Sequence, residues 1–201
     1  MRRGVHYLPG HLDARQQVDL LAEIRGVIDQ APLFVPVMPR TGKPFSVRMT
    51  NCGALGWVSD KALGYRYQAT HPVTGRRWPP MPRALLDLWD GIAGHPSPPQ
   101  ACLVNYYAPS TRMGSHRDAD EEDTAAPVLS VSLGDDAVFH VGGTARGDAK
   151  ERITLGSGDV IVLGGPARLA YHGIDRVLAG TSALLAEGGR INLTLRRVAL
   201  S

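Results

Sequence analysis

Apolar positions recur at helical spacing in two stretches of the first half of the chain. Between residues 13 and 29 they share one face of a predicted amphipathic helix, formed by Leu20, Leu21, Ile24, Val27 and Ile28. Asp13 and Gln16 have the spacing of a capping box at its start. The segment RALLDLWDGIAG, residues 83–94, predicts a second, shorter helix with one apolar side.

The segments around these helices are rich in turn residues. Between residues 36 and 56 we expect a short strand at Phe45, Val47 and Met49. Residues 57–82 are predicted to form a loop that carries several aromatic side chains and ends in WPPMP. We therefore expect residues 1–100 to be a helical and loop extension that covers the rest of the protein, rather than an independent domain.

From Ala101 onward the pattern changes to short apolar runs separated by glycine, proline and aspartate, among them ACLVNYY, PVLSVSLG, AVFHVGG, RITLGSGDVIVLGG and RINLTLRRV. Closely spaced short strands of this kind are typical of a sandwich, jelly roll or barrel. The 23 Gly and 15 Pro of the 201 residues agree with many turns. We predict a mainly β fold with flanking α-helices, a single domain over residues 1–201 whose β core covers residues 101–199.

Composition narrows the class of protein further. Apolar residues make up 43% and charged residues 20% of the chain, as in ordinary globular proteins. No apolar run approaches the roughly 18 residues of a membrane span, and MRRGVHYLPG lacks the apolar stretch of a signal peptide. Cys52 and Cys102 are far apart and form no CxxC pair, so we expect two reduced packing residues in a cytoplasmic protein.

Positive charge in this chain comes almost entirely from arginine. The net charge is +3, and 19 of the 22 basic residues are Arg. Arginine forms bidentate contacts with phosphate and carboxylate, so the bias permits an anionic partner. A GC-rich genome would produce the same bias.

The last apolar run, RINLTLRRV, is the most informative strand. Side chains two residues apart share a face of a strand. Ile191, Leu193 and Leu195 therefore form an apolar face, while the opposite face carries polar groups, namely Arg190, Asn192, Thr194 and Arg196. The polar face is either exposed to solvent or lines an anion pocket, and the spacing of the two arginines permits a small dicarboxylate between them.

Two H-x-D pairs raise the question of a metal site. His11 and Asp13 stand at a helix start, where Asp13 is expected to act as the cap. His116 and Asp118 follow a β run, and with a third His they would form the facial triad of non-haem Fe(II) oxygenases. His172 is the candidate third ligand, with His140 as its competitor.

The order of an H-x-D pair, a distant His and a strand with two Arg matches the chemistry of oxygenases that use a 2-oxo acid. Several longer motifs then resemble the bacterial AlkB-type Fe(II)/2-oxoglutarate-dependent nucleic-acid dealkylases. The motifs run in family order between about residues 45 and 197 and comprise FSVRMTNCGALGWVSD, GYRYQ with RRWPPMP, LVNYYAP, HRDADEED, PVLSVSLGDDAVFHVGG, LGSGDVIVLGGPARLAYHGI and RINLTLRR. The resemblance implies a double-stranded β-helix, or jelly-roll, core.

The resemblance also assigns roles residue by residue. The implied iron ligands are His116, Asp118 and His172. The implied contacts to 2-oxoglutarate come from Asn105, Tyr107, Arg190, Asn192 and Arg196, with the two arginines on its two carboxylates. The implied contacts to the nucleic acid come from Trp57, Tyr65, Tyr67, Asp120 and Arg146.

Aromatic side chains suit such a substrate, because an enzyme that acts on a base takes it out of the stack. From position alone, Trp57 and Tyr65 would equally pack under a loop. The acidic run DADEED is expected to be a solvated loop, with Asp120 as the exception.

We expect an iron enzyme that oxidatively demethylates N-alkylated bases such as 1-methyladenine or 3-methylcytosine, acting as a cytoplasmic monomer on single-stranded DNA or on RNA. It would consume 2-oxoglutarate and O2 and release succinate, CO2 and formaldehyde. Two alternatives are a related oxygenase with a protein, lipid or small-molecule substrate, and a non-enzymatic jelly-roll binding module.

Overall fold

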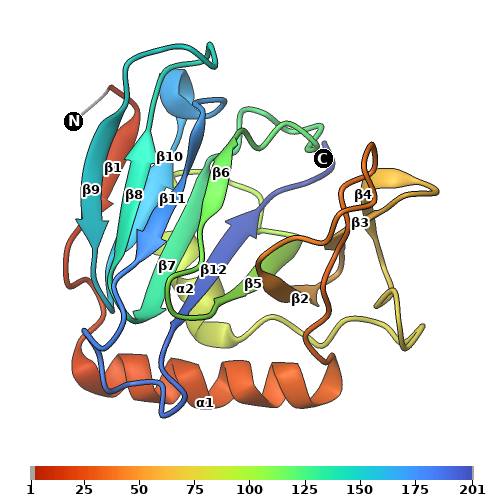
Figure 1. Cartoon of the computed structure of the whole chain (residues 1–201), viewed down its shortest axis with the longest axis horizontal. Helices are drawn as coiled ribbons and strands as arrows, with labels where there is room; N and C mark the ends of the chain where they lie inside the picture. Colours follow the sequence, from red (N-terminus) through yellow and green to blue (C-terminus); the bar gives the residue numbers. More distant parts are fainter. Residues whose placement is uncertain (1–2, 201) are drawn as a thin grey trace.

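Two facing β-sheets form the body of the protein, and their strands overlap in the view of Figure 1. The computed structural model describes residues 3–200, so residues 1–2 and 201 of the predicted domain lie outside it. The six-stranded sheet has the order β1 (Val5–Leu8), β10 (Val160–Leu163), β7 (Val128–Gly134), β12 (Arg190–Arg196), β5 (Ala101–Tyr107) and β2 (Arg48–Gly53). The four-stranded sheet has the order β6 (Met113–His116), β11 (His172–Val177), β8 (Ala137–Val141) and β9 (Glu151–Leu155).

The strand pairings confirm the predicted jelly roll. Strand β5 pairs with β12, β6 with β11, β7 with β10 and β8 with β9, and every pair is antiparallel. The first strand of the core thus pairs with the last, the second with the last but one, and so inward. The strands of this core lie between Ala101, where β5 begins, and Arg196, where β12 ends.

Two helices cover the outer face of the six-stranded sheet. Helix α1 (Ala14–Gln30) runs along the bottom of Figure 1, and α2 (Arg83–Ile92) packs beside it. The Asp13 carboxylate accepts a hydrogen bond from the Gln16 amide at 2.8 Å, and the Gln16 side chain accepts one from the Asp13 amide at 2.9 Å. The predicted capping box is therefore present, and it gives Asp13 a structural role.

Strand β12 separates the two hydrophobic layers. Ile191, Leu193 and Leu195 pack toward the helices in one core cluster. A second cluster, which includes Phe139 and Ile174, fills part of the space between the sheets. The polar side chains of β12 point into that space, so the polar face is an interior surface rather than a solvated one.

Three predictions about the first hundred residues need correction. Strand β2 begins at Arg48, later than the expected strand at Phe45–Met49. Residues 57–82 are not only loop, because β3 (Gly56–Asp60) and β4 (Gly64–Gln68) form a hairpin. Strand β1 was not predicted. Its four residues form a strand by pairing with β10 at the edge of the large sheet. Strands β1 and β2 extend the large sheet on both edges beyond the 101–199 core.

The two cysteines are free and fully buried, as expected of packing residues. Cys52 on β2 and Cys102 on β5 are register partners in the sheet. Within residues 3–200, neither helix has the length and apolar character that crossing a bilayer requires.

Candidate active site

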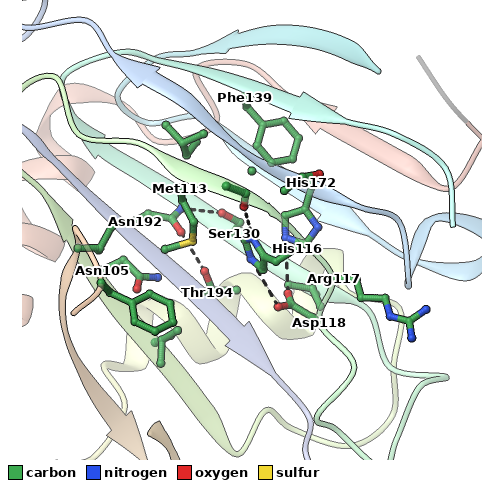
Figure 2. A pocket seen from close by; sticks show the side chains of 18 of the residues that line it. Asn105, Met113, His116, Arg117, Asp118, Ser130, Phe139, His172, Asn192 and Thr194 are labelled. Atoms are coloured by element: carbon green, nitrogen blue, oxygen red, sulfur yellow. Dashed lines mark hydrogen bonds and ion pairs between the residues drawn. The ribbon is translucent and has the colours of Figure 1, made fainter. Parts of the chain in front are cut away.

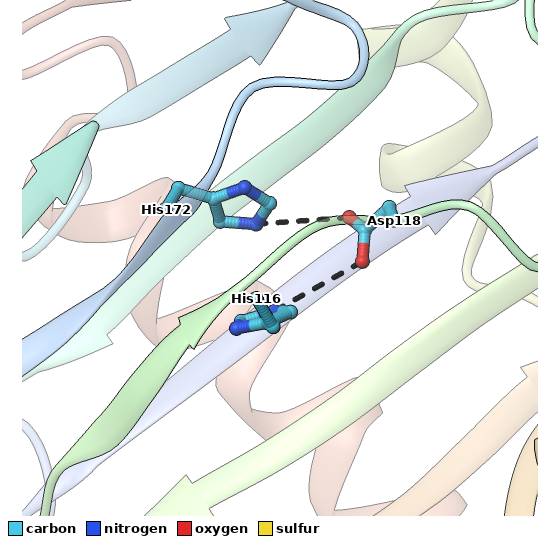
Figure 3. A group of neighbouring side chains, drawn as sticks. All are labelled: His116, Asp118 and His172. Atoms are coloured by element: carbon cyan, nitrogen blue, oxygen red, sulfur yellow. Dashed lines mark ion pairs between the residues drawn. The ribbon is translucent and has the colours of Figure 1, made fainter. Parts of the chain in front are cut away.

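His116, Asp118 and His172 meet at one end of the space between the sheets (Figure 3). His116 ends β6, and His172 begins β11 directly opposite it in the ladder. Asp118 follows β6 by two residues, with one carboxylate oxygen 4.0 Å from His116 Nε2 and the other 3.8 Å from His172 Nε2. One ligand atom from each residue lies within 4.8 Å of the others, which is close enough for all three to bind one ion.

Backbone carbonyls orient both imidazole rings. His116 Nδ1 lies 3.0 Å from the Gly114 carbonyl oxygen, and His172 Nδ1 lies 2.9 Å from that of Ala170. A carbonyl only accepts, so each Nδ1 carries the proton and each Nε2 keeps its lone pair for a metal.

The protonation states of the triad suit a divalent cation. Burial, together with the nearby His116, lowers the pKa of His172 to about 4, so its imidazole is neutral at physiological pH. Burial alone would raise the pKa of Asp118, but the charge of the neighbouring Arg196 guanidinium holds that pKa well below its usual range.

One atom marks the place where an ion fits. The Asp118 carboxylate oxygen that lies 3.8 Å from His172 Nε2 is buried without a hydrogen-bond partner. A buried, unpaired carboxylate oxygen is costly unless a cation completes it. Two imidazoles and one carboxylate are the donor set of the facial triad, which leaves the opposite side of an octahedral ion open.

A cavity of about 710 Å³ extends from the triad between the two sheets. Figure 2 shows polar side chains of β5, β7 and β12 beside the triad, among them Asn105, Ser130, Asn192 and Thr194. The Asn192 amide donates to the Ser130 hydroxyl at 2.6 Å, and Thr194 donates to the Asn192 oxygen at 2.9 Å. The oxygen of the Asn105 side chain is buried and unpartnered.

Arg190 lines the same cavity. Its guanidinium donates to the Ser132 hydroxyl at 2.8 Å and is 1% exposed, and its Nε has no partner. Burial lowers the pKa of Arg190 to about 10, yet the group stays charged at neutral pH. Tyr107 is also buried, and its hydroxyl contacts the Met113 sulfur at 3.6 Å. Arg190 therefore offers a buried cation to an acidic ligand.

Arg196 has a different environment from Arg190. Its guanidinium donates to Asp118 at 2.8 Å and to the Tyr67 hydroxyl at 3.1 Å. Arg196 therefore sits at the metal end of the cavity, about six strand residues from Arg190, a distance of roughly 20 Å along the backbone. The long side chains of both arginines reach into the cavity that lies between.

The β3–β4 hairpin supplies aromatic residues at the cavity mouth. The rings of Trp57 and Tyr65 stack with centroids 5.4 Å apart and planes at 23°. The Trp57 indole N–H donates to Asp120 at 2.8 Å. These three predicted substrate contacts therefore lie together, and Tyr65 is half exposed. Tyr67 differs, because its hydroxyl turns inward and donates to Glu121.

Arginines border the mouth on the other side. The Arg146 guanidinium lies 5.0 Å from the centre of the Tyr171 ring and donates to the Ser115 carbonyl at 3.3 Å. Arg117 lies 5.8 Å from the same ring. Both side chains are exposed and line the cavity.

The structure also bears on the alternative third ligand, His140, and on the acidic run DADEED. His140 lies outside the triad, and its Nδ1 pairs with Asp175 at 2.7 Å. The acidic run is not simply a solvated loop, because Glu121 and Asp123 are each 5% exposed. Glu121 pairs with Arg168, which lies within the motif LGSGDVIVLGGPARLAYHGI but for which no role was predicted.

A histidine pair and an aspartate at the mouth of a jelly roll, with a buried arginine deeper inside, define the class of non-haem Fe(II) oxygenases. Residues 4–196 match the family model of the 2OG-Fe(II) oxygenase superfamily, and the chain belongs to that family as an AlkB-type Fe(II)/2-oxoglutarate-dependent dioxygenase.

Relatives of the chain support this assignment over nearly its whole length. It is 54% identical to the alpha-ketoglutarate-dependent dioxygenase AlkB homolog of Caulobacter vibrioides, covering 96% of this chain and 87% of that protein. It is 43% identical to AlkB of Escherichia coli, covering 89% and 83%. The solved structure of OsALKBH1 superposes with a TM-score of 0.80 at 30% identity, covering 98% and 99%.

Proposed function

We propose that this enzyme oxidatively removes N-methyl groups from bases such as 1-methyladenine and 3-methylcytosine in DNA, and in RNA. The observation that carries the proposal is the stacked Trp57–Tyr65 pair with Asp120, placed at the mouth of the cavity that contains the His116–Asp118–His172 triad. Relatives named as demethylases of DNA N(6)-methyladenine and of N6-methyladenosine RNA support a nucleic-acid substrate.

The triad would hold Fe(II) through His116 Nε2, His172 Nε2 and the Asp118 carboxylate. Bound iron and 2-oxoglutarate together supply the chemistry: O2 places one oxygen atom in succinate, formed with CO2, and the other on the N-methyl carbon. The resulting hydroxymethyl group leaves as formaldehyde when the N–C bond breaks, and the base regains its ordinary form.

Arg190 is proposed to bind the distal carboxylate of 2-oxoglutarate. It is a buried cation that lines the cavity, its hydrogen bond to Ser132 holds the guanidinium in place, and its Nε is left without a partner for a ligand carboxylate to fill. Arg196, Asn105, Tyr107 and Asn192 line the same cavity and are proposed to contact the cosubstrate closer to the metal.

The damaged base is proposed to lie against Trp57 and Tyr65. A methyl group on a ring nitrogen of 1-methyladenine or 3-methylcytosine leaves the base cationic at neutral pH. Asp120 at the mouth and Asp118 inside favour such a charge. An exocyclic amino group of the base could take the place of the Trp57 N–H on Asp120.

The arginines on the opposite rim are proposed to bind the strand. Arg117 and Arg146, held against Tyr171, present exposed guanidiniums to phosphates that flank the flipped base. A single strand avoids the cost of unpairing, so we expect a preference for single-stranded DNA. We also expect the enzyme to act as a monomer in the cytoplasm, which light scattering and cell fractionation test.

Succinate formation with different additions tests the proposal. The enzyme is incubated with Fe(II), 2-oxoglutarate, ascorbate and O2, alone, with an unmodified oligonucleotide, and with the same oligonucleotide carrying one 1-methyladenine. The proposal predicts succinate and formaldehyde only with the methylated strand, and neither from His116→Ala. Equal succinate without nucleic acid would favour an oxygenase of another substrate class, and no succinate under any condition would favour a binding module.

A further inference from the structure

A cluster of four buried charged residues includes the metal ligand Asp118 and lies beside the two histidines of the triad. Asp118 and Glu121 provide two negative charges, and Arg168 and Arg196 provide two positive charges. Their exposed fractions are 6%, 5%, 3% and 7%, respectively. Buried charges are costly unless they are paired, so the two positive and two negative side chains stabilise one another in the interior.

Arg168 connects Glu121 with the backbone of Asp118. One guanidinium nitrogen donates to the Glu121 carboxylate at 3.1 Å, and another donates to the Asp118 carbonyl oxygen at 2.8 Å. Its Nε donates to the Ala126 carbonyl at 2.7 Å. The planar Arg168 guanidinium thereby holds the backbone at the metal ligand Asp118 and at Ala126 in place.

Arg196 connects Glu121 with the side chain of Asp118. It donates to the Asp118 carboxylate at 2.8 Å, and its Nε lies 3.6 Å from Glu121. The Tyr67 hydroxyl of the hairpin donates to the same Glu121 oxygen, while Arg168 binds the other. Glu121 is thus the acceptor on which both arginines and the hairpin converge.

We propose that Glu121 is a positioning residue for the metal site: through Arg168 and Arg196 it holds the backbone and the carboxylate of Asp118 in the orientation that binds the ion. The inference rests on the metal site of the proposed function but requires no particular nucleic-acid substrate.

The balance of charges in the cluster predicts how a change at Glu121 alters the affinity of the site for a metal ion. In the unaltered protein, Arg168 and Arg196 are paired with the side chains of Glu121 and Asp118. Replacement of Glu121 by glutamine leaves one arginine charge unmatched beside the site. That charge repels a divalent cation and draws Asp118 away toward the arginines, so metal affinity falls.

Binding of Co(II) to the metal-free full chain tests the proposal, followed by the visible absorption of the bound ion and by calorimetry. Glu121→Gln is expected to weaken Co(II) binding about 10- to 100-fold and to change the absorption band. Glu122→Gln is the matched control, because it makes the same chemical change at the exposed neighbouring residue, and its affinity should stay within about twofold.

Arg168→Lys is the second variant, since it keeps the charge balance and guards against a Glu121→Gln protein that does not fold. Lysine cannot span Glu121 and the Asp118 carbonyl together, so we expect Co(II) binding about tenfold weaker. Folded Glu121→Gln and Arg168→Lys proteins that bind Co(II) as tightly as Glu122→Gln would overturn the proposal. Absence of Co(II) binding by the unaltered protein would instead overturn the metal site on which it rests.

Discussion

His116 and His172 face each other directly across the β6–β11 ladder, with ring centres 4.6 Å apart. They are 56 residues apart in the sequence, and the jelly-roll pairing of the second strand with the last but one brings them together. Asp118 lies just past the end of β6, where the chain leaves the sheet and turns its carboxylate back toward both rings.

The assignment of the third ligand leads to a first prediction. His172→Ala removes an Nε2 atom of the triad, so the protein should lose stoichiometric Fe(II) and at least about 100-fold in 2-oxoglutarate turnover. His140→Gln is the control, since His140 pairs with Asp175 on the small sheet. Metal analysis after gel filtration measures both. Metal retained by His172→Ala and lost by His140→Gln would reverse the assignment.

Arg190 gives a second prediction. Arg190→Met removes a buried cation from the proposed carboxylate site, and we expect a cost of about 3 kcal/mol, or roughly 100-fold in the KM for 2-oxoglutarate. The value of kcat at saturating 2-oxoglutarate should fall much less. Arg176→Met, on the exposed side of β11, serves as the control. An unchanged KM in Arg190→Met would remove Arg190 from the cosubstrate site.

The aromatic pair at the cavity mouth gives a third prediction. Loss of a stacking platform costs about 1–3 kcal/mol per base, so Trp57→Ala should raise the KM for a methylated oligonucleotide about tenfold or more. The KM for 2-oxoglutarate should not change, because the indole lies at the mouth. Trp57→Phe keeps a ring but loses the N–H donor to Asp120, and we expect an intermediate KM. Steady-state assays with varied oligonucleotide measure it, and equal KM values in all three proteins would exclude stacking on Trp57.

The pH dependence of stability gives a fourth prediction. Burial outweighs the attraction of Asp175 and lowers the pKa of His140 in the folded protein. The unfolded chain therefore binds the proton more readily. The contribution of His140 to stability is complete above its unfolded pKa of about 6.5 and is lost as pH falls toward the lower folded value.

Denaturant unfolding of the metal-free protein at pH 7 and pH 5 measures this contribution. The free energy of unfolding should fall toward pH 5, with His140 contributing at most about 1.4 kcal/mol per pH unit. His140→Gln should show a smaller fall over the same range. An identical fall in the variant and the unaltered protein would show that His140 does not carry this dependence.

Local patterns predicted much of the fold and the inner site. The two-residue alternation in β12 separated the face that packs on the helices from the face that lines the cavity. The capping box at Asp13 and Gln16 marked the start of α1 within a residue. Both the alternation in β12 and the capping box are patterns of a few neighbouring residues, so they can be recognised without knowing which distant residues pack against them.

Features that depend on distant partners were missed. Glu121 stands in an acidic run, and it is buried only because Arg168, 47 residues away, and Arg196 meet it. The β3–β4 hairpin has a turn of several residues without an Asn-Gly signal, and Asp60 holds that turn by accepting from the Ala62 and Leu63 amides. No periodicity of a single segment carries such information.

The most direct test of the account is the mass of a single-stranded oligonucleotide carrying one 1-methyladenine. It is measured after incubation with the enzyme, Fe(II), 2-oxoglutarate, ascorbate and air. The account predicts loss of one methylene, dependent on 2-oxoglutarate and absent with His116→Ala. An unchanged mass, with an enzyme that binds Fe(II) and forms succinate, would contradict the assignment of methylated nucleic acid as the substrate.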